Sequence, residues 1–288
     1  MEKQHTIIKS VSFSGIALHT GARATLCLNP AEINTGIVFR RVDLPGAPAV
    51  RALAANVVDV RRGTTIADKN GAVVYTVEHI MSALHAAGID NCIVDMDGQE
   101  PPIADGSASP YWQMIQESGI LEQEAEAKIF RCTRPLWVKN KETQVILTPP
   151  EADTLTIACT ASFKGCPYDP QYHAITVTPD SYGTEIAGAR TFVEYKDLEQ
   201  LIAMGLCKGG SLDAAAILHN GAIICKDRLL WHDEIVRHKI LDLIGDLYLC
   251  GCRVKANVVA IKPGHPRNVE IAGLMQKEIM ENSTELSY

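Results

Sequence analysis

The sequence lacks long apolar runs and runs of basic residues, and these absences exclude several classes of protein. No apolar stretch among the 288 residues approaches the ~20 that would span a bilayer, so we expect no transmembrane segment. The formal net charge is −7, and no cluster of Lys and Arg could follow a phosphate backbone, so we expect no nucleic-acid binding. The opening segment MEKQHTIIKSVSFSG has neither the apolar core nor the cleavage site of a secretory signal.

Cys-x-x-Cys pairs are also absent, although the chain contains nine cysteines. Cys250 and Cys252 flank a single glycine, and others lie in apolar stretches such as TLCLNP and TIACTA. An odd number of scattered cysteines in apolar stretches is typical of free thiols in a reducing compartment, so we expect a cytoplasmic protein. Hydrophobic residues make up 47% and charged residues 21%, which are the proportions of an ordinary globular protein.

The chain divides into two parts that each combine strand-like and helix-like segments, and its length allows two ordinary domains. In each part a histidine-bearing helix is followed by a glycine and a strand, as in EHIMSALHAAGIDNCIVDM and RHKILDLIGDLYLCGCRVKANVVAI. The charged segment 120–128 is poor in turn and sheet signals, so we take it as the boundary between domains 1–124 and 125–288. The pattern predicts an α+β fold with two domains of related topology.

Three further features of the pattern have predicted structural roles. The segment near 193–225 predicts a helix and a short strand pair inserted between the main elements, and the last helix is expected to begin near Asn268. Asp233 is expected to be the N-cap of the helix that follows it. His85 has no partner in the pattern of its own helix, so we interpret it as structural.

The segment VRHKILDLIGDLYL, residues 236–249, places an unusual set of polar groups on one side of a predicted helix. At about 100° per residue, Lys239, Asp242 and Asp246 fall on the same side as His238. The opposite side carries an apolar core stripe formed by Val236, Ile240, Leu243, Ile244 and Leu247. A histidine and an aspartate four positions apart can direct a nitrogen and an oxygen at one point, which is half of a zinc site. A solvated polar face is the alternative interpretation.

Glu78 and His79, at the start of the earlier helix, could complete such a site. Neighbouring helical residues point about 100° apart, so His79 can bind a metal while Glu78 faces a water molecule beside it. A catalytic zinc needs three protein ligands, an open position and a nearby base, and His79, His238 and Asp242 supply two nitrogens and a carboxylate. The two helices come from different halves, which predicts a site in the cleft between the domains. Taken singly, His79 could be an interface residue and Glu78 a carboxylate that complements the helix dipole.

Loops in the second part carry weaker signals. His265 in KPGHPRN follows a strand and a glycine, where catalytic groups are common and plain surface residues are more common. The turns GARTF (188–192) and KGGSLD (208–213) combine small residues with a hydroxyl or a charge. Alone, none of these segments defines a reaction.

Taken together, segments in a fixed order resemble the UDP-3-O-acyl-N-acetylglucosamine deacetylases, the zinc amidohydrolases of bacterial lipid A synthesis. The segments, which span residues 14–268, are SGIALHTG, TVEHIMSALHAAGIDN, PPIADGSA, ARTF, KGGSLD, DEIVRHKILDLIGDL and KPGH. The resemblance implies two α+β domains that form a two-layer sandwich with the active site between them. It also implies hydrolysis of an N-acetyl group, with acetate and the free amino-sugar nucleotide as products.

The resemblance assigns roles to individual residues of this sequence. The positions that match the ligands of one catalytic Zn²⁺ are His79, His238 and Asp242. Those that match catalytic groups are Glu78 as general base, His265 as catalytic histidine, Asp246 as the residue that orients His265, and Thr191 near the oxyanion. Those that match substrate contacts are Lys239 and, for the nucleotide or sugar, Phe163, Phe192, His19 and Lys262. Those that match the acyl-chain passage, with core packing as the alternative, are Leu198, Leu201, Ile202, Ala214 and Ile217.

The sequence departs from the family pattern at three positions and leaves two other classes to weigh. Ala17 replaces a usual glycine, Arg267 a usual leucine and Asp95 a common glutamate, which affects acyl preference and loop geometry rather than the chemistry.

A binding protein with a structural metal would normally show four ligands, often cysteines, and none of the nine cysteines lies beside the His/Asp set. A peptidase is the third class, but no H-E-x-x-H occurs. We expect a monomer whose partner is an acylated UDP-amino sugar. The sequence does not decide the preferred length of the acyl chain, or whether the native metal is zinc or iron.

Overall fold

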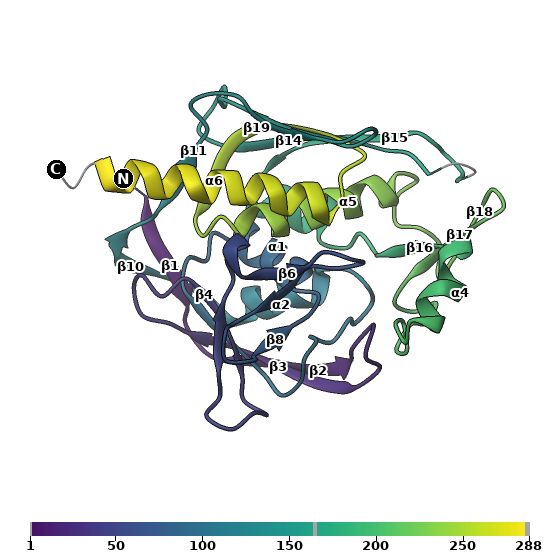
Figure 1. Ribbon diagram of the computed structural model, residues 1–288, viewed down its shortest axis with the longest axis horizontal. Coiled ribbons are helices and arrows are strands. Elements are labelled where there is room, and N and C mark those ends of the chain that lie inside the picture. The colour runs from purple at the N-terminus through teal and green to yellow at the C-terminus, as the bar shows by residue number, and fades with distance from the viewer. Residues whose placement is uncertain (1, 164–165, 286–288) are drawn as a thin grey trace.

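Two sheets, one from each half of the chain, enclose a layer of helices (Figure 1). The computed structural model describes residues 2–163 and 166–285. Helices α1 (Glu78–Ala86) and α5 (Glu234–Tyr248) share one continuous apolar cluster with the inner faces of both sheets. The core therefore lies between the sheets, where the helices of the two halves meet.

The first half forms a five-stranded sheet in the order β2-β3-β9-β4-β5. Its strands are β2 (Val11–Ile16), β3 (Arg23–Pro30), β4 (Ile37–Arg41), β5 (Ala49–Arg51) and β9 (Cys92–Met96). Strand β9 follows α1 and pairs antiparallel with β3 and parallel with β4. Leu26 and Leu28 of β3 point into the core, because alternate side chains of a strand lie on the same face.

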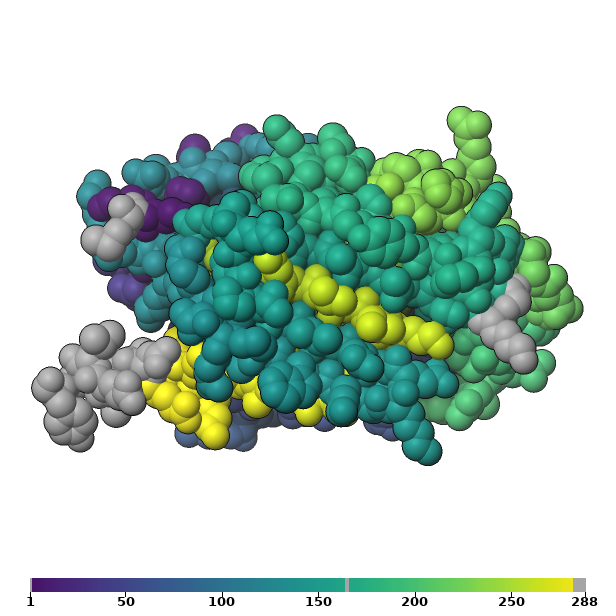
Figure 2. Space-filling model, turned by 90° about the horizontal axis from the view of Figure 1, so that it is seen from above, coloured from purple at the N-terminus to yellow at the C-terminus, as the bar shows by residue number. Residues whose placement is uncertain are grey.

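The second half forms a sheet with the corresponding order β12-β13-β19-β14-β15. Its strands are β12 (Leu136–Lys139), β13 (Gln144–Thr148), β14 (Leu155–Ala161), β15 (Gln171–Val177) and β19 (Arg253–Ile261), and β11 (Ile129–Arg131) pairs with the start of β19. Strand β19 follows α5 and pairs antiparallel with β13 and parallel with β14. Figure 2 looks onto the outer face of this sheet, across which β19 runs as a yellow stripe.

The two halves therefore have related topology, as the sequence predicted. In each, the strand after the histidine-bearing helix lies at the centre of the sheet between two antiparallel pairs. A second helix then follows this central strand: α2 (Ser109–Ser118) in the first half and α6 (His265–Glu285) in the second. The α+β class and the sandwich of two related domains are confirmed.

Smaller elements extend this frame. In the first half, β6 (Val57–Asp59), β7 (Thr65–Ala67) and β8 (Val73–Val74) form an antiparallel sheet after the short turn η1 (Ala54–Asn56). In the second half, the short turns α3 (Pro179–Ser181) and η2 (Tyr182–Ile186) precede the inserted segment. The insertion comprises β16 (Phe192–Glu194), α4 (Tyr195–Ala203), β17 (Ala216–His219) and β18 (Ala222–Ile224), and it projects from one end of the molecule (Figure 1). It thus has one strand more than the predicted pair.

The segment at the predicted domain boundary is a strand, which corrects the expectation of a linker without sheet structure. Residues Ile120–Glu126 form β10, which pairs antiparallel with β1 (Lys3–Ile7). Most of its side chains are exposed, so the strand lacks the apolar alternation by which a half-buried strand is recognised. The division at residues 124 and 125 falls inside β10 and stays a prediction.

The last helix begins earlier than predicted, at His265 instead of near Asn268. Pro266 fits the first turn of a helix, where its missing N–H would have no intrahelical partner. The backbone N–H groups of Arg267 and Asn268 both donate to the carbonyl of Gly264, which starts the helix there. The candidate catalytic histidine thus lies on a helix terminus rather than on a free loop.

Two side chains of the histidine-bearing helices have structural roles. Asp233 occupies the N-cap position of α5 as predicted, but its carboxylate makes no capping bond and instead accepts from Nε of Arg237 at 2.8 Å. His85 is buried and stacks on Tyr248 with 4.5 Å between the ring centroids. The carbonyl of Ile244 lies 3.2 Å from its Nδ1, which supports the predicted structural role of His85.

Candidate metal centre and active site

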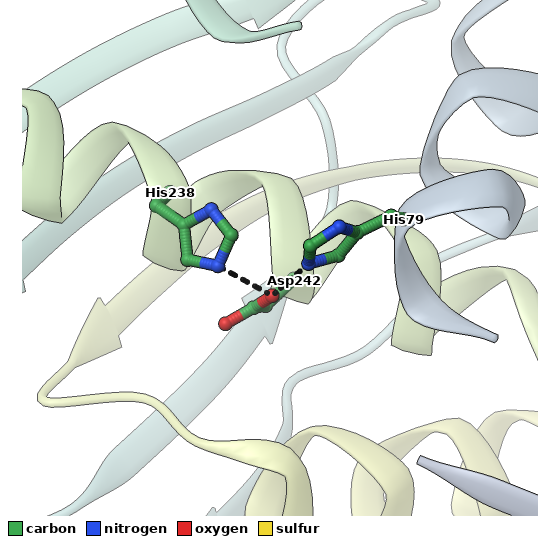
Figure 3. A group of neighbouring side chains, drawn as sticks. All are labelled: His79, His238 and Asp242. Carbon is green, nitrogen blue, oxygen red and sulfur yellow. Dashed lines mark ion pairs between the residues drawn. The ribbon is translucent and has the colours of Figure 1, made fainter. Parts of the chain in front are cut away.

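Helices α1 and α5 bring His79 beside His238 and Asp242 (Figure 3). Oδ1 of Asp242 lies 3.4 Å from Nε2 of His238 and 3.8 Å from Nε2 of His79. The two imidazole rings meet edge to face with 5.1 Å between their centroids. Gly245 permits this close approach, because a Cβ there would collide with the carbonyl oxygen of Glu78. The structure thus joins the three predicted metal ligands in one place.

The hydrogen bonds of these residues fit a metal site. The carbonyl oxygen of Ala189 lies 2.9 Å from Nδ1 of His238, and a carbonyl only accepts, so Nδ1 carries the proton and Nε2 is free to ligate. Nδ1 of His79 is buried and has no hydrogen-bond partner among the described residues. Two imidazole nitrogens and one carboxylate, with ligand atoms all within 4.8 Å of one another, match the donor set of a catalytic zinc.

Burial and neighbouring charges hold these groups in the protonation states that a metal requires. Burial lowers the pKa of His79 to about 3 and also lowers the pKa of His238, so both rings are neutral. Burial alone would raise the pKa of Asp242, but Lys239 and the surrounding histidines outweigh it and lower that pKa. A metal ligand must be unprotonated, and all three residues satisfy this condition near neutral pH.

Glu78 and His265 face each other next to the histidine pair. Oε1 of Glu78 lies 3.8 Å from Nε2 of His265, while Nδ1 of the same ring donates to Oδ2 of Asp246 at 2.9 Å. Burial raises the pKa of Glu78 to about 7, although His265 opposes the shift. Burial would lower the pKa of His265, but Asp246 and Glu78 raise it to about 9. The pair combines a carboxylate that can take a proton with an imidazolium that can give one.

Two residues without a predicted role hold these proton-transfer groups. The backbone N–H of Thr64 donates to Oε2 of Glu78 at 2.9 Å, and its hydroxyl donates to Oδ1 of Asp246 at 2.6 Å. Nδ2 of Asn268 donates to Oδ2 of Asp246 at 3.0 Å. Thr64 and Asn268 lie 182 and 22 residues from Asp246 in the sequence, and neither belongs to a spacing pattern with a chemical meaning. Only the folded arrangement reveals them.

Lys239, Thr191 and two phenylalanines lie around the histidine pair. Nζ of Lys239 donates to Oδ2 of Asp242 at 2.7 Å and lies 5.2 Å from the centroid of Phe192. The rings of Phe163 and Phe192 meet with 4.8 Å between their centroids. All four residues line the same cavity as Glu78 and the predicted ligands, a volume of about 270 Å³.

A second cavity of about 330 Å³ adjoins the first. Leu18, Arg62, Thr191 and Phe192 line both cavities, so the two lie side by side and share part of their walls. The walls of the second cavity are mainly apolar, and the predicted substrate contacts among them are His19, Leu198, Leu201, Ile202 and Ile217. A polar cavity with titratable side chains therefore lies beside an apolar one.

Ala214 and Lys262 are not among the described residues that line the two cavities. Ala214 is buried, and its neighbour Ala215 lines the apolar cavity in its place. Lys262 follows β19 and forms an ion pair with Glu142 at 3.5 Å, with 40% of its side chain exposed. Their contacts with substrate stay predictions.

The sequence matches the family UDP-3-O-acyl N-acetylglycosamine deacetylase over residues 4–277. A relative from Myxococcus xanthus (strain DK1622), named UDP-3-O-acyl-N-acetylglucosamine deacetylase, is 42% identical over 92% of this chain and 83% of that protein. A relative of the same name from Chlamydia pneumoniae is 39% identical over 96% of this chain and 97% of that protein. The chain belongs to this deacetylase family. The resemblance drawn from the motifs is confirmed.

Membership of the deacetylase family defines the chemistry of the site in broad terms. The chain is a hydrolase of a metalloenzyme family, and His79, His238 and Asp242 are its possible metal site. Within residues 2–163 and 166–285, no helix combines the length and the apolar character needed to cross a membrane.

Proposed function

We propose that this chain hydrolyses the N-acetyl group of UDP-3-O-acyl-N-acetylglucosamine to give acetate and UDP-3-O-acyl-glucosamine, an early committed step of lipid A synthesis. The observation that carries the proposal is the pairing of Glu78 and His265, 3.8 Å apart, beside two histidines and an aspartate in one cavity. The family match and the names of the relatives support the same substrate. The adjoining apolar cavity offers space for an acyl chain.

We assign one catalytic Zn²⁺ to His79, His238 and Asp242. Two neutral imidazoles and an ionised carboxylate suit zinc, and three protein ligands leave a position open for reaction. When bound, the ion acts as a Lewis acid that polarises the amide carbonyl and lowers the pKa of water.

The protein's own residues move the protons. Glu78 accepts a proton from the water whose oxygen attacks the carbonyl carbon, and the carbonyl electron pair moves to its oxygen. The hydroxyl of Thr191, which lines the same cavity, donates to this oxyanion in the proposed mechanism. The electron pair on this oxygen then reforms the carbonyl as the carbon–nitrogen bond breaks, and the departing nitrogen keeps the bond's electrons and takes the Nε2 proton of His265. Asp246 keeps the imidazolium oriented through its bond to Nδ1.

The remaining predicted residues bind the two ends of the substrate in this proposal. Lys239, Phe163 and Phe192 lie beside the reacting groups and bind the sugar or nucleotide, with His19 and Lys262 as further contacts. The acyl chain occupies the passage of the inserted segment lined by Leu198, Leu201, Ile202 and Ile217, with Ala214 as a further predicted contact. We further propose that the protein works as a monomer. We also propose a cytoplasmic location, which the nine free cysteines support because such thiols are typical of a reducing compartment.

An acetate-release assay on the acylated UDP-sugar tests the proposal. Purified protein should release one acetate for each amine formed, lose activity with a chelator, and regain it with added Zn²⁺. Protein heated to denaturation serves as the blank. No release from any zinc-loaded sample would overturn the assigned reaction, and release that a chelator leaves unchanged would overturn the metal's role.

A further inference from the structure

The carboxylate of Asp246 accepts hydrogen bonds from three residues, one directly before β7 and two on α6. The hydroxyl of Thr64 donates to Oδ1 at 2.6 Å, whereas Nδ1 of His265 and Nδ2 of Asn268 donate to Oδ2 at 2.9 and 3.0 Å. Thr64, Asp246 and Asn268 are fully buried. An ionised carboxylate only accepts hydrogen bonds, so donors on both of its oxygens fix its rotation about the Cβ–Cγ bond. The orientation of Asp246 is therefore set by Thr64 and Asn268 as well as by the histidine.

Thr64 also contacts Glu78, the proposed general base. Its backbone N–H donates to Oε2 of Glu78 at 2.9 Å, and its carbonyl accepts from the N–H of Val77 at 3.2 Å. These two bonds join Thr64 to the start of α1. The preceding Gly63 packs on the same carboxylate, because a Cβ there would lie 3.1 Å from Oε1 of Glu78. A single residue thus touches groups on α1 and α5.

We propose that Thr64 and Asn268 are positioning residues for the deacetylation, because they hold Asp246 so that His265 presents Nε2 toward Glu78. The inference rests on the proposed function. Oε1 of Glu78 and Nε2 of His265 are 3.8 Å apart, which is too long for a hydrogen bond between them. Their relative placement therefore depends on the groups behind them, and Thr64 supports both. Such supporting partners commonly contribute about 10–100-fold to the activity of a site.

Thr64→Val and Thr64→Ser separate this role from a contribution to folding. Valine keeps the shape of the side chain and the backbone N–H to Glu78 but removes the hydroxyl, whereas serine keeps the hydroxyl and loses a methyl group. We expect Thr64→Val to lower kcat about 10–100-fold with KM changed less than about threefold, and Thr64→Ser to restore most of kcat. A merely structural threonine would instead show both variants losing thermal stability with kcat unchanged, which would overturn the proposal.

Thr65→Val is the matched control. Thr65 is the next residue in the chain and is buried, yet among the described residues its hydroxyl shows no hydrogen bond. The same substitution there should leave kcat within about threefold of the wild type. An equal loss of kcat at both positions would mean that the hydroxyl of Thr64 has no special part, and would also overturn the proposal.

A double-mutant cycle tests whether Thr64 acts through His265. In a His265→Ala background the ring to be oriented is absent, so adding Thr64→Val should change kcat by less than about threefold. A further loss as large as in the wild type would overturn the assignment. Asn268→Leu, which removes the second donor to Asp246, repeats the test if Thr64→Val does not fold. Acetate release by the wild type is measured alongside, so failure of the proposed function is distinguished from failure of this inference.

Discussion

At the scale of single residues, the site depends on keeping two neighbouring groups in opposite protonation states. Burial raises the pKa of Glu78 to about 7, and Asp246 helps to raise the pKa of His265 to about 9 against the effect of burial. A carboxylate and an imidazolium at this separation favour each other's charged form. Between these two pKa values Glu78 is ionised and His265 is protonated, as the proposed reaction requires.

These pKa values predict a bell-shaped dependence of kcat/KM on pH. Glu78 must be ionised, so the rate rises as the pH passes its pKa, at or below about 7, because a bound cation would lower that value. His265 must be protonated, so the rate falls as the pH passes its pKa, at or below about 9 for the same reason. Steady-state rates at constant ionic strength from pH 5 to 10 would measure both limbs. A rate independent of pH over this range would contradict both assignments.

Two variants assign the limbs. Glu78→Gln should remove the acidic limb and lower kcat about 10²–10⁴-fold, the usual contribution of a positioned proton-transfer group. His265→Ala should flatten the basic limb. Both should keep about one metal per chain by elemental analysis, because neither residue is a predicted ligand. If His265→Ala lost its metal, His265 would be a ligand and the roles would have to be reassigned.

At the scale of secondary structure, the crossing of α1 and α5 places the ligands, and Gly245 determines how closely the helices approach. A Cβ at Gly245 would collide with the carbonyl oxygen of Glu78, which is backbone and cannot rotate away. We therefore expect Gly245→Ala to push the helices apart, weaken metal binding, and lower both the melting temperature and kcat. Gly273→Ala in α6 is the control, since nothing lies within 4 Å of a Cβ there. That change should raise stability by about 0.5–1 kcal/mol through helix propensity.

Residues of the inserted segment line an apolar cavity beside the reacting groups. Its walls include Leu198, Leu201 and Ile217, and it shares lining residues with the cavity of the reacting groups. Each buried methylene contributes about 0.8 kcal/mol, so we expect kcat/KM for the 3-O-acylated UDP-sugar to exceed that for plain UDP-N-acetylglucosamine by orders of magnitude. Competing the two substrates in one reaction measures the ratio directly. Equal values would leave these side chains as core packing.

At the scale of the whole molecule, the sequence predicted the repeated frame better than its connections. The repeated order of strand, helix, glycine and strand predicted two domains of related topology, because buried helices and central strands carry strong apolar periodicity. The corresponding strand order of the two sheets agrees with this prediction. Strand β10 was missed because its exposed side chains give no alternation of that kind. Thr64 and Asn268 were missed because their importance comes from hydrogen bonds to residues distant in the chain. The local sequence pattern predicted most of the helices and strands, whereas the residues that hold the catalytic groups in place depend on tertiary contacts.

The predicted ligands come from different halves of the chain, so a metal bound by them would link the two halves and should stabilise the whole fold. An ion that binds only the folded protein contributes about 4 kcal/mol at a thousand times its Kd, which should raise the melting temperature by several degrees. Adding Zn²⁺ to chelator-treated wild type should show this rise by calorimetry, whereas His79→Ala should show little and Glu78→Gln nearly the full rise. The sign of the pH dependence of the metal-free protein's stability follows from His79. Its pKa is about 3 in the folded protein and near 6.5 in the unfolded chain. Unfolding below pH 6.5 therefore takes up protons, and the metal-free protein should lose stability as the pH falls from 6.5 toward 3. A wild-type melting temperature that does not respond to Zn²⁺ would contradict a metal shared between the domains.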